Sequence, residues 1–231
     1  EAWATLSGLS LGQESLDPEE YDNAIGALTN FIDKFPASSH LDDAKKKAER
    51  FQNELKRVES GQLKLEGQWL DRTKVIEERV QIGGRLLFNR MKRLASSGQT
   101  MEAMQVFEIL EKNFGGSAAF PDAVMLARQL IPMLLAAVED RKAQLNRRAA
   151  RDKMRLQIAQ GAEREQLEAI FKQERESLEA MAAANEKGGT KWLPLAYTTD
   201  KTIAAVGTKI AGEATRLNAL SVEKMRLSMI N

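Results

Sequence analysis

The chain has 231 residues, of which 43% are hydrophobic and 29% charged, and its formal net charge is +1. This composition fits a folded helical protein and excludes a disordered one. The near-neutral charge argues against nucleic-acid binding, which needs a strongly basic surface. Cysteine is absent and His40 is the only histidine, which excludes disulfides, zinc thiolates and a histidine-rich metal site within one chain. No cofactor is predicted.

The hydropathy pattern predicts no transmembrane segment. The longest apolar stretch, Ile131 to Val138, contains Pro132 and is much shorter than the roughly 18 residues that a spanning helix needs. The chain begins at Glu1 and not at Met, which is expected of a trimmed or processed chain that has lost its targeting segment.

The first predicted element is a helix that begins at Asp17 and Pro18, since Asp is a good N-cap and Pro fits the first turn. Its apolar residues share one face: Ala24, Leu28, Phe31, Ile32 and Phe35. Pro36 ends this helix, and a second helix is expected from about Leu41 to Glu59.

A short β-hairpin is predicted over residues 62–71. Leu63, Leu65 and Trp69 alternate with polar residues around Glu66-Gly67, which is a turn sequence, although a coil also fits the pattern. A further helix is expected from about Thr73 to Ala95.

Residues 24–55 recur in weakened form 79 positions later, without a gap. The matched pairs keep identical residues: Ala24/Ala103, Phe35/Phe114, Ser38/Ser117, Asp43/Asp122, Ala44/Ala123, Ala48/Ala127 and Leu55/Leu134. A constant offset across two helices and their connection predicts one helical-hairpin unit used twice, with copies near 17–57 and 86–134. The segment 60–85 is then an insertion within a repeat region spanning 1–135.

The remaining residues, 136–231, predict a long helical arm. Residues 134–187 contain no proline and a single glycine, Gly161, so one helix of roughly 80 Å is expected after a kink or interruption at Pro132. A turn at Gly188-Gly189 would reverse the chain, and the final helix follows a heptad frame: Ile203, Val206, Ile210, Leu217, Leu220 and Leu227, broken by Glu213 and Lys224. The apolar stripes of the two helices predict that they pack against each other as an antiparallel, coiled-coil-like hairpin. Packing of the same stripes between chains, in a homo-oligomer, would bury them equally well.

The segment Tyr21-x-x-Ala24-Ile25-x-x-Leu28-x-x-Phe31-Ile32-x-x-Phe35-Pro36-x-Ser38, followed by Asp43-Ala44, resembles the tetratricopeptide-like (TPR-like) repeats of bacterial envelope proteins. The outer-membrane assembly lipoprotein and the Tol–Pal coordinator are examples of this type. The resemblance covers about Asp17–Arg57 and Leu86–Leu134. It implies an all-α fold with a short α-solenoid that binds protein segments, in the periplasm or elsewhere in the envelope, and it implies no chemistry. The copies are not contiguous at the usual period of about 34 residues.

Five residues are candidate partner contacts. Trp69 and Trp192 each follow a glycine closely in a non-helical connection, so they either plug the ends of the helical layer or anchor a partner. Arg147, Arg148 and Arg151 belong to residues 141–155, which carry seven basic side chains and one acid. Such a basic run could lie on an anionic membrane. Six glutamates within residues 163–179 balance its positive charge along the same predicted helix, however, which favours a solvated arm.

No catalytic or nucleotide-binding motif occurs, and the glycine pairs at 83–84, 115–116 and 188–189 are interpreted as helix ends. The sequence therefore favours a non-enzymatic protein–protein interaction scaffold with an unidentified partner. A helical accessory region of a larger enzyme and a membrane-surface coiled-coil adaptor remain alternatives.

Overall fold

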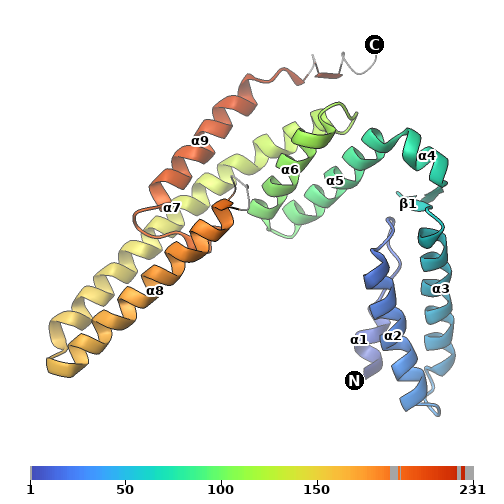
Figure 1. Cartoon of the computed structure of the whole chain (residues 1–231), viewed down its shortest axis with the longest axis horizontal. Helices are drawn as coiled ribbons and strands as arrows, with labels where there is room; N and C mark the ends of the chain where they lie inside the picture. The colour runs from blue at the N-terminus through green and yellow to red at the C-terminus, as the bar shows by residue number, and fades with distance from the viewer. Residues whose placement is uncertain (1, 188–191, 193, 223–224, 227–231) are drawn as a thin grey trace. The chain divides into compact units, whose positions relative to one another are not determined.

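The computed structural model of the chain describes residues 2–187, 192, 194–222 and 225–226 (Figure 1). Apart from one two-stranded sheet, the regular elements that it describes are helices, which confirms the predicted all-α class. The chain divides into two compact units, Glu1–Ile82 and Gly83–Asn231, each with its own hydrophobic core. Residue 135, after which the sequence predicts the arm, lies inside a continuous helix of the second unit.

The first unit is built on the helical hairpin of α2 (Pro18–Lys34) and α3 (Leu41–Glu59). The start of α2 is fixed as predicted, since Pro18 is its first residue and the Asp17 amide donates to the Glu20 carboxylate at 3.0 Å. The core residues come from both helices: Tyr21, Ala24, Leu28, Phe31, Ala44, Ala48 and Phe51. Both predicted helices are confirmed.

A short helix that the sequence did not predict, α1 (Ala2–Ser7), packs against α2. Its Trp3 ring lies 5.4 Å from the Phe31 ring and stacks on His40 at 5.1 Å. Six residues cannot form a stable helix alone, so these tertiary contacts hold α1 in place.

The predicted β-hairpin is confirmed. Strands β1 (Leu63–Leu65) and β2 (Gln68–Leu70) pair antiparallel, and the turn residues Glu66 and Gly67 have φ of 52° and 80°. Two consecutive positive φ angles define a turn whose twist matches that of the strands. The next helix is interrupted, because α4 (Arg72–Glu77) ends before its C-cap residue Glu78 and α5 (Arg79–Ser96) begins directly after it. The predicted continuous helix from Thr73 to Ala95 is therefore two helices.

The second unit centres on α5, α6 (Thr100–Phe114) and α7 (Phe120–Ile158). Gly83 and Gly84 lie inside α5, so their interpretation as a helix end is wrong. An added Cβ would lie 2.3 Å from the Phe114 ring at Gly83 and 2.1 Å from the Ser117 hydroxyl at Gly84. The two glycines therefore let α5 pack closely against the turn between α6 and α7.

The long predicted helix folds back on itself. Helix α7 continues through Pro132 without interruption but ends at Ile158, and α8 (Gly161–Lys187) returns antiparallel along it (Figure 1). Gly161 has φ of 53°, a backbone conformation that glycine adopts with least strain. The arm is thus a hairpin of α7 and α8 that turns near Gly161, and Gly188-Gly189 lies outside the described residues.

Helix α9 (Ile203–Ala219) packs along the first half of α7, and the single 3₁₀ turn η1 (Leu195–Tyr197) contacts both α7 and α8. A Cβ on Gly207 would lie 3.2 Å from Val138, while Arg128 contacts Leu217, so α9 runs antiparallel to α7. The heptad residues that face α7 are buried: Ile203, Val206, Ile210 and Leu217. This part of the seam is satisfied within the chain, and Lys224 and Leu227 lie outside the described residues.

The repeated residues occupy equivalent places in the two helical hairpins. The Ser38 amide donates to the Phe35 carbonyl at 3.0 Å, and the Ser117 amide donates to the Phe114 carbonyl at 2.9 Å. The next turn bonds follow the same offset: Leu41 to Ser38 at 3.1 Å and Phe120 to Ser117 at 3.0 Å. The matched alanines at 24/103, 44/123 and 48/127 are all buried. The hairpins α2–α3 and α6–α7 therefore share these turn hydrogen bonds and the burial of the matched alanines. The matched phenylalanines differ, since Phe35 is 47% exposed and Phe114 packs against the core of the second unit.

Candidate functional site

Trp69 lies on β2, opposite Lys64 of β1, in the first unit. The Arg57 guanidinium lies 4.1 Å from the centre of the Trp69 ring, and the Lys64 amine lies 5.9 Å from it. The indole is half-buried, so part of it stays accessible while two cations cover its face. The Trp69 side chain is therefore partly exposed, with Arg57 and Lys64 packed against its ring.

Trp192 is only 2% exposed and belongs to the core of the second unit. Its backbone carbonyl accepts a hydrogen bond from the Gln105 amide of α6 at 2.9 Å. A side chain that is buried in this way offers no surface to a partner. Of the two roles that the sequence leaves open for Trp192, the structure shows the packing role.

The three candidate arginines lie on α7 but differ in their contacts. Arg148 forms ion pairs with Asp152 at 3.6 Å and with Glu174 of α8. Arg147 and Arg151 are exposed, and neither forms an ion pair or hydrogen bond within the described residues. Arg148 therefore joins the two helices of the arm, whereas Arg147 and Arg151 remain available for contacts outside the chain.

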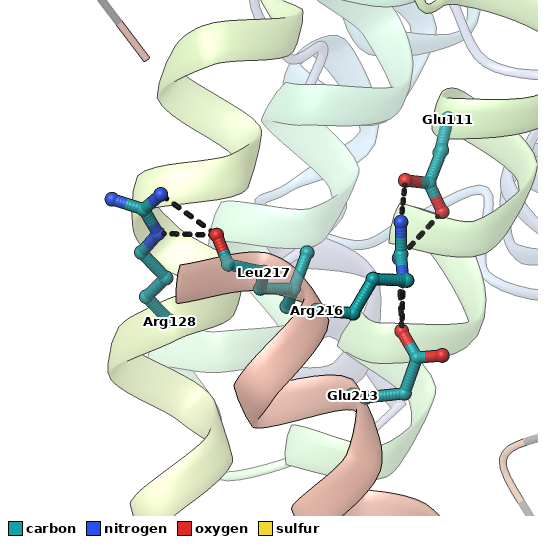
Figure 2. A network of polar contacts seen from close by, with 5 residues as sticks. All are labelled: Glu111, Arg128, Glu213, Arg216 and Leu217. Atoms are coloured by element: carbon teal, nitrogen blue, oxygen red, sulfur yellow. Dashed lines mark hydrogen bonds and ion pairs between the residues drawn. The ribbon is translucent and has the colours of Figure 1, made fainter. Parts of the chain in front are cut away.

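Polar side chains that the sequence analysis missed hold α9 in place (Figure 2). The Arg128 guanidinium on α7 donates to the Leu217 carbonyl from Nε at 3.1 Å and from Nη2 at 2.7 Å, and also to the Leu220 carbonyl. These carbonyls end α9, so a cation stabilises them by hydrogen bonding and by complementing the helix dipole.

Arg216 of α9 makes a second set of polar contacts (Figure 2). We call Arg128 and Arg216, with their partners, the arginine clamp. It binds Glu111 of α6 through two nitrogens, at 2.6 Å and 2.9 Å, and binds Glu213 at 2.9 Å. The hydrogen bonds that Arg216 donates to the Glu111 carboxylate are the main cause that raises the pKa of Arg216 above its ordinary value. Pairs 105 residues apart leave no periodic signal, which is why the sequence did not reveal them.

An apolar stripe on α7 faces away from the core. Its apolar members are exposed and recur at helical spacing: Met125, Pro132, Met133 and Ala136. The polar Gln129, also exposed, lies among them. Met125 is 43% and Met133 is 53% exposed. The stripe thus presents flexible apolar side chains, which suit contact with another protein.

The two helices of the arm enclose an open groove of about 540 Å³. Apolar side chains of both helices line it, including Leu145, Leu156 and Phe171, and charged side chains form its rim. Within the described residues, no group of three or more histidine, cysteine or carboxylate side chains is placed to hold a metal ion. The groove is therefore an apolar surface with a charged rim.

One finding qualifies the prediction of no transmembrane segment. Among the described residues, α7 is the one helix with an 18-residue window apolar enough to cross a membrane, at a mean hydropathy of 1.4. In the structure, 44% of that window is buried within the protein. Charged side chains of α7 also contact the chain itself, since Arg128 binds α9 and Asp122 pairs with Arg226 at 2.6 Å. The buried part of the window belongs to the core of the second unit.

Comparison with protein-family models, with curated proteins and with solved structures finds no match for this chain.

Proposed function

We propose that the chain is a non-enzymatic protein–protein interaction scaffold in which two TPR-like helical hairpins form a short α-solenoid. The observation that carries this proposal is the shared turn of α2–α3 and α6–α7, with the same backbone hydrogen bonds 79 residues apart. Repeated hairpins of this kind expose extended helical surfaces, which commonly bind other proteins. The resemblance to envelope repeats supports a periplasmic or envelope-associated location, and the arm of α7 and α8 then acts as a coiled-coil-like extension.

The apolar stripe on α7 is the proposed partner surface. Its methionines adapt their shape to a partner at low cost, and an exposed apolar patch of this kind often marks an interaction site. The stripe lies on the second hairpin and opposes its buried face, which leaves it accessible within the second unit. Trp69, in the first unit, is a second candidate contact.

An affinity capture from an envelope extract tests the proposal. The bait is the whole chain, and the variant bait carries Met125→Gln and Met133→Gln, which keep side-chain length but remove apolar character. Ile170→Gln with Met181→Gln is the matched control, since both are exposed apolar residues of α8 outside the stripe, at 49% and 47%. Circular dichroism verifies that the three proteins have equal helical content.

The proposal predicts a partner that the wild type and the control enrich and that the stripe variant loses. Purified partner must then bind purified wild type directly. Capture that is identical for all three baits, or no partner that binds directly, contradicts the proposed surface. Turnover of a substrate that a single Asp or Glu substitution abolishes would instead favour an enzyme.

A further inference from the structure

One face of the arm combines basic and apolar side chains. On α7, Arg147, Arg151, Met154 and Ile158 recur at positions i, i+4, i+7 and i+11, which places them on one side of the helix. All four are exposed, with Met154 at 61% and Ile158 at 77%. We call these four residues the outer face of the arm.

The fold separates this face from the acidic residues. Helix α8 packs on the opposite side of α7, where Leu145, Arg148 and Asp152 line the groove between the helices. Asp152 is the only acid among residues 141–158, and it pairs with Arg148. Because the chain reverses near Gly161, α8 lies on the other side of α7, and none of the four residues of the outer face is acidic. The nearest acid on the same side of α7 is Asp140, seven residues before Arg147. The charge balance expected along a single helix therefore does not apply to this face.

We propose that the outer face binds the surface of an anionic lipid bilayer. Its arginines match the negative headgroups, and the apolar side chains of Met154 and Ile158 can enter the interface beside them. Ile158 ends α7 at the reversal of the hairpin, so a flat surface can reach it. Nucleic acid fits this face less well, since the four residues include no aromatic side chain for base stacking. The proposal goes beyond the scaffold function and uses a different surface of α7.

Vesicle co-sedimentation of the whole chain tests the proposal. One set of vesicles is phosphatidylcholine alone, and the other contains phosphatidylglycerol at about one third of the lipid. Binding is expected only with the anionic vesicles and should weaken as salt screens the headgroups. Each arginine at such a surface contributes roughly fivefold to the partition coefficient, so Arg147→Glu with Arg151→Glu should lower it by at least about 25-fold.

The matched control is Lys172→Glu with Arg175→Glu, which changes the net charge equally but alters exposed residues of α8. It should bind the anionic vesicles within about twofold of the wild type. A second variant, Met154→Ser with Ile158→Ser, keeps the charge and should lose several-fold in binding because less apolar area enters the interface. Circular dichroism verifies that each variant remains folded.

Three results would overturn the proposal: no binding of the wild type at low salt, full binding by the arginine variant, or an equal loss in the α8 control. Polyglutamate, added in solution, imitates an acidic protein segment and competes with the vesicles for the outer face. If the serine variant binds vesicles like the wild type and polyglutamate displaces both proteins completely, the outer face recognises an acidic protein and not a lipid surface.

Discussion

Tyr21 connects the helices of the first unit to its β-hairpin through a short polar network. Its hydroxyl donates to the Glu54 carboxylate at 3.0 Å and accepts from the Leu16 amide at 3.3 Å. Glu54 also pairs with Lys64 of β1 at 2.7 Å. Burial, with a further contribution from Glu54, raises the pKa of Tyr21 from 10.0 to about 12. The folded state therefore holds this proton more tightly than the unfolded chain does.

The stability that the Tyr21 proton contributes should be fully present below pH 10 and should be lost as the pH rises through about 12. Urea unfolding at pH 9 and at pH 11.5 measures this loss. Tyr21→Phe should reduce the loss and should cost on the order of 1 kcal/mol at pH 8, since the hydrogen bonds disappear. Tyr197→Phe, at the only other tyrosine, is the control. If both variants keep the wild-type alkaline loss, Tyr21 is not its source.

Gly84 of α5 lies against the turn between α6 and α7, where an added Cβ would lie 2.1 Å from the buried Ser117 hydroxyl. Gly84→Ala should destabilise the second unit by about 1–3 kcal/mol, as overpacking does. Gly212→Ala in α9, where no atom lies within 4 Å, should be neutral or slightly stabilising. Thermal unfolding of both variants gives the comparison, and a stable Gly84→Ala protein would argue against the close packing.

At the scale of elements, the arginine clamp stabilises the packing of α9 against α7. Arg128→Gln should cost about 2 kcal/mol, since it removes charged hydrogen bonds to the Leu217 and Leu220 carbonyls. Arg216→Gln should cost less than about 1 kcal/mol, because the Arg216 side chain is 38% exposed and solvent screens its ion pairs. Hydrogen exchange in residues 203–219 measures both effects. Equal exchange in the two variants would show that Arg128 does not hold α9.

The sequence predicted those elements whose signals are local. The alternation around Glu66-Gly67 indicated the β-hairpin, and Pro18 and Pro36 bracketed α2. It missed the reversal between α7 and α8 because a lone glycine, Gly161, is also tolerated inside a helix and the flanking residues are strong helix formers. It missed α1 because tertiary contacts of Trp3, not local propensity, hold that helix.

The candidate site was less predictable than the fold. Trp192 and Trp69 have similar sequence surroundings, yet one is buried and the other half-exposed, since burial depends on which helices close over each connection. The exposure of Met125 and Met133 could not be predicted, because both lie among other apolar residues of α7 and composition alone does not show which side of the helix the core covers.

At the scale of the whole molecule, two hydrophobic cores share no residue. One core lies within Glu1–Ile82 and the other within Gly83–Asn231. We expect calorimetry to resolve two unfolding transitions. Tyr21→Phe should shift one of them and Gly84→Ala the other. A single transition that both variants shift together would contradict two cooperative units.

Helix α7 connects the second copy of the repeated hairpin to the arm. Helix α7 supplies the second helix of the repeat, with buried Ala123 and Ala127, and continues into the arm beyond the region that α9 covers. A single helix therefore carries the apolar stripe near its start and the outer face near its end.

The central claim is that the apolar stripe of α7 binds a protein partner, and calorimetric titration of the captured, purified partner tests it most directly. The dissociation constant should rise at least about tenfold for Met125→Gln with Met133→Gln, as expected when apolar contacts at an interface are lost. It should stay within about twofold for the control, Ile170→Gln with Met181→Gln. Equal dissociation constants for the wild type and the stripe variant would contradict the account.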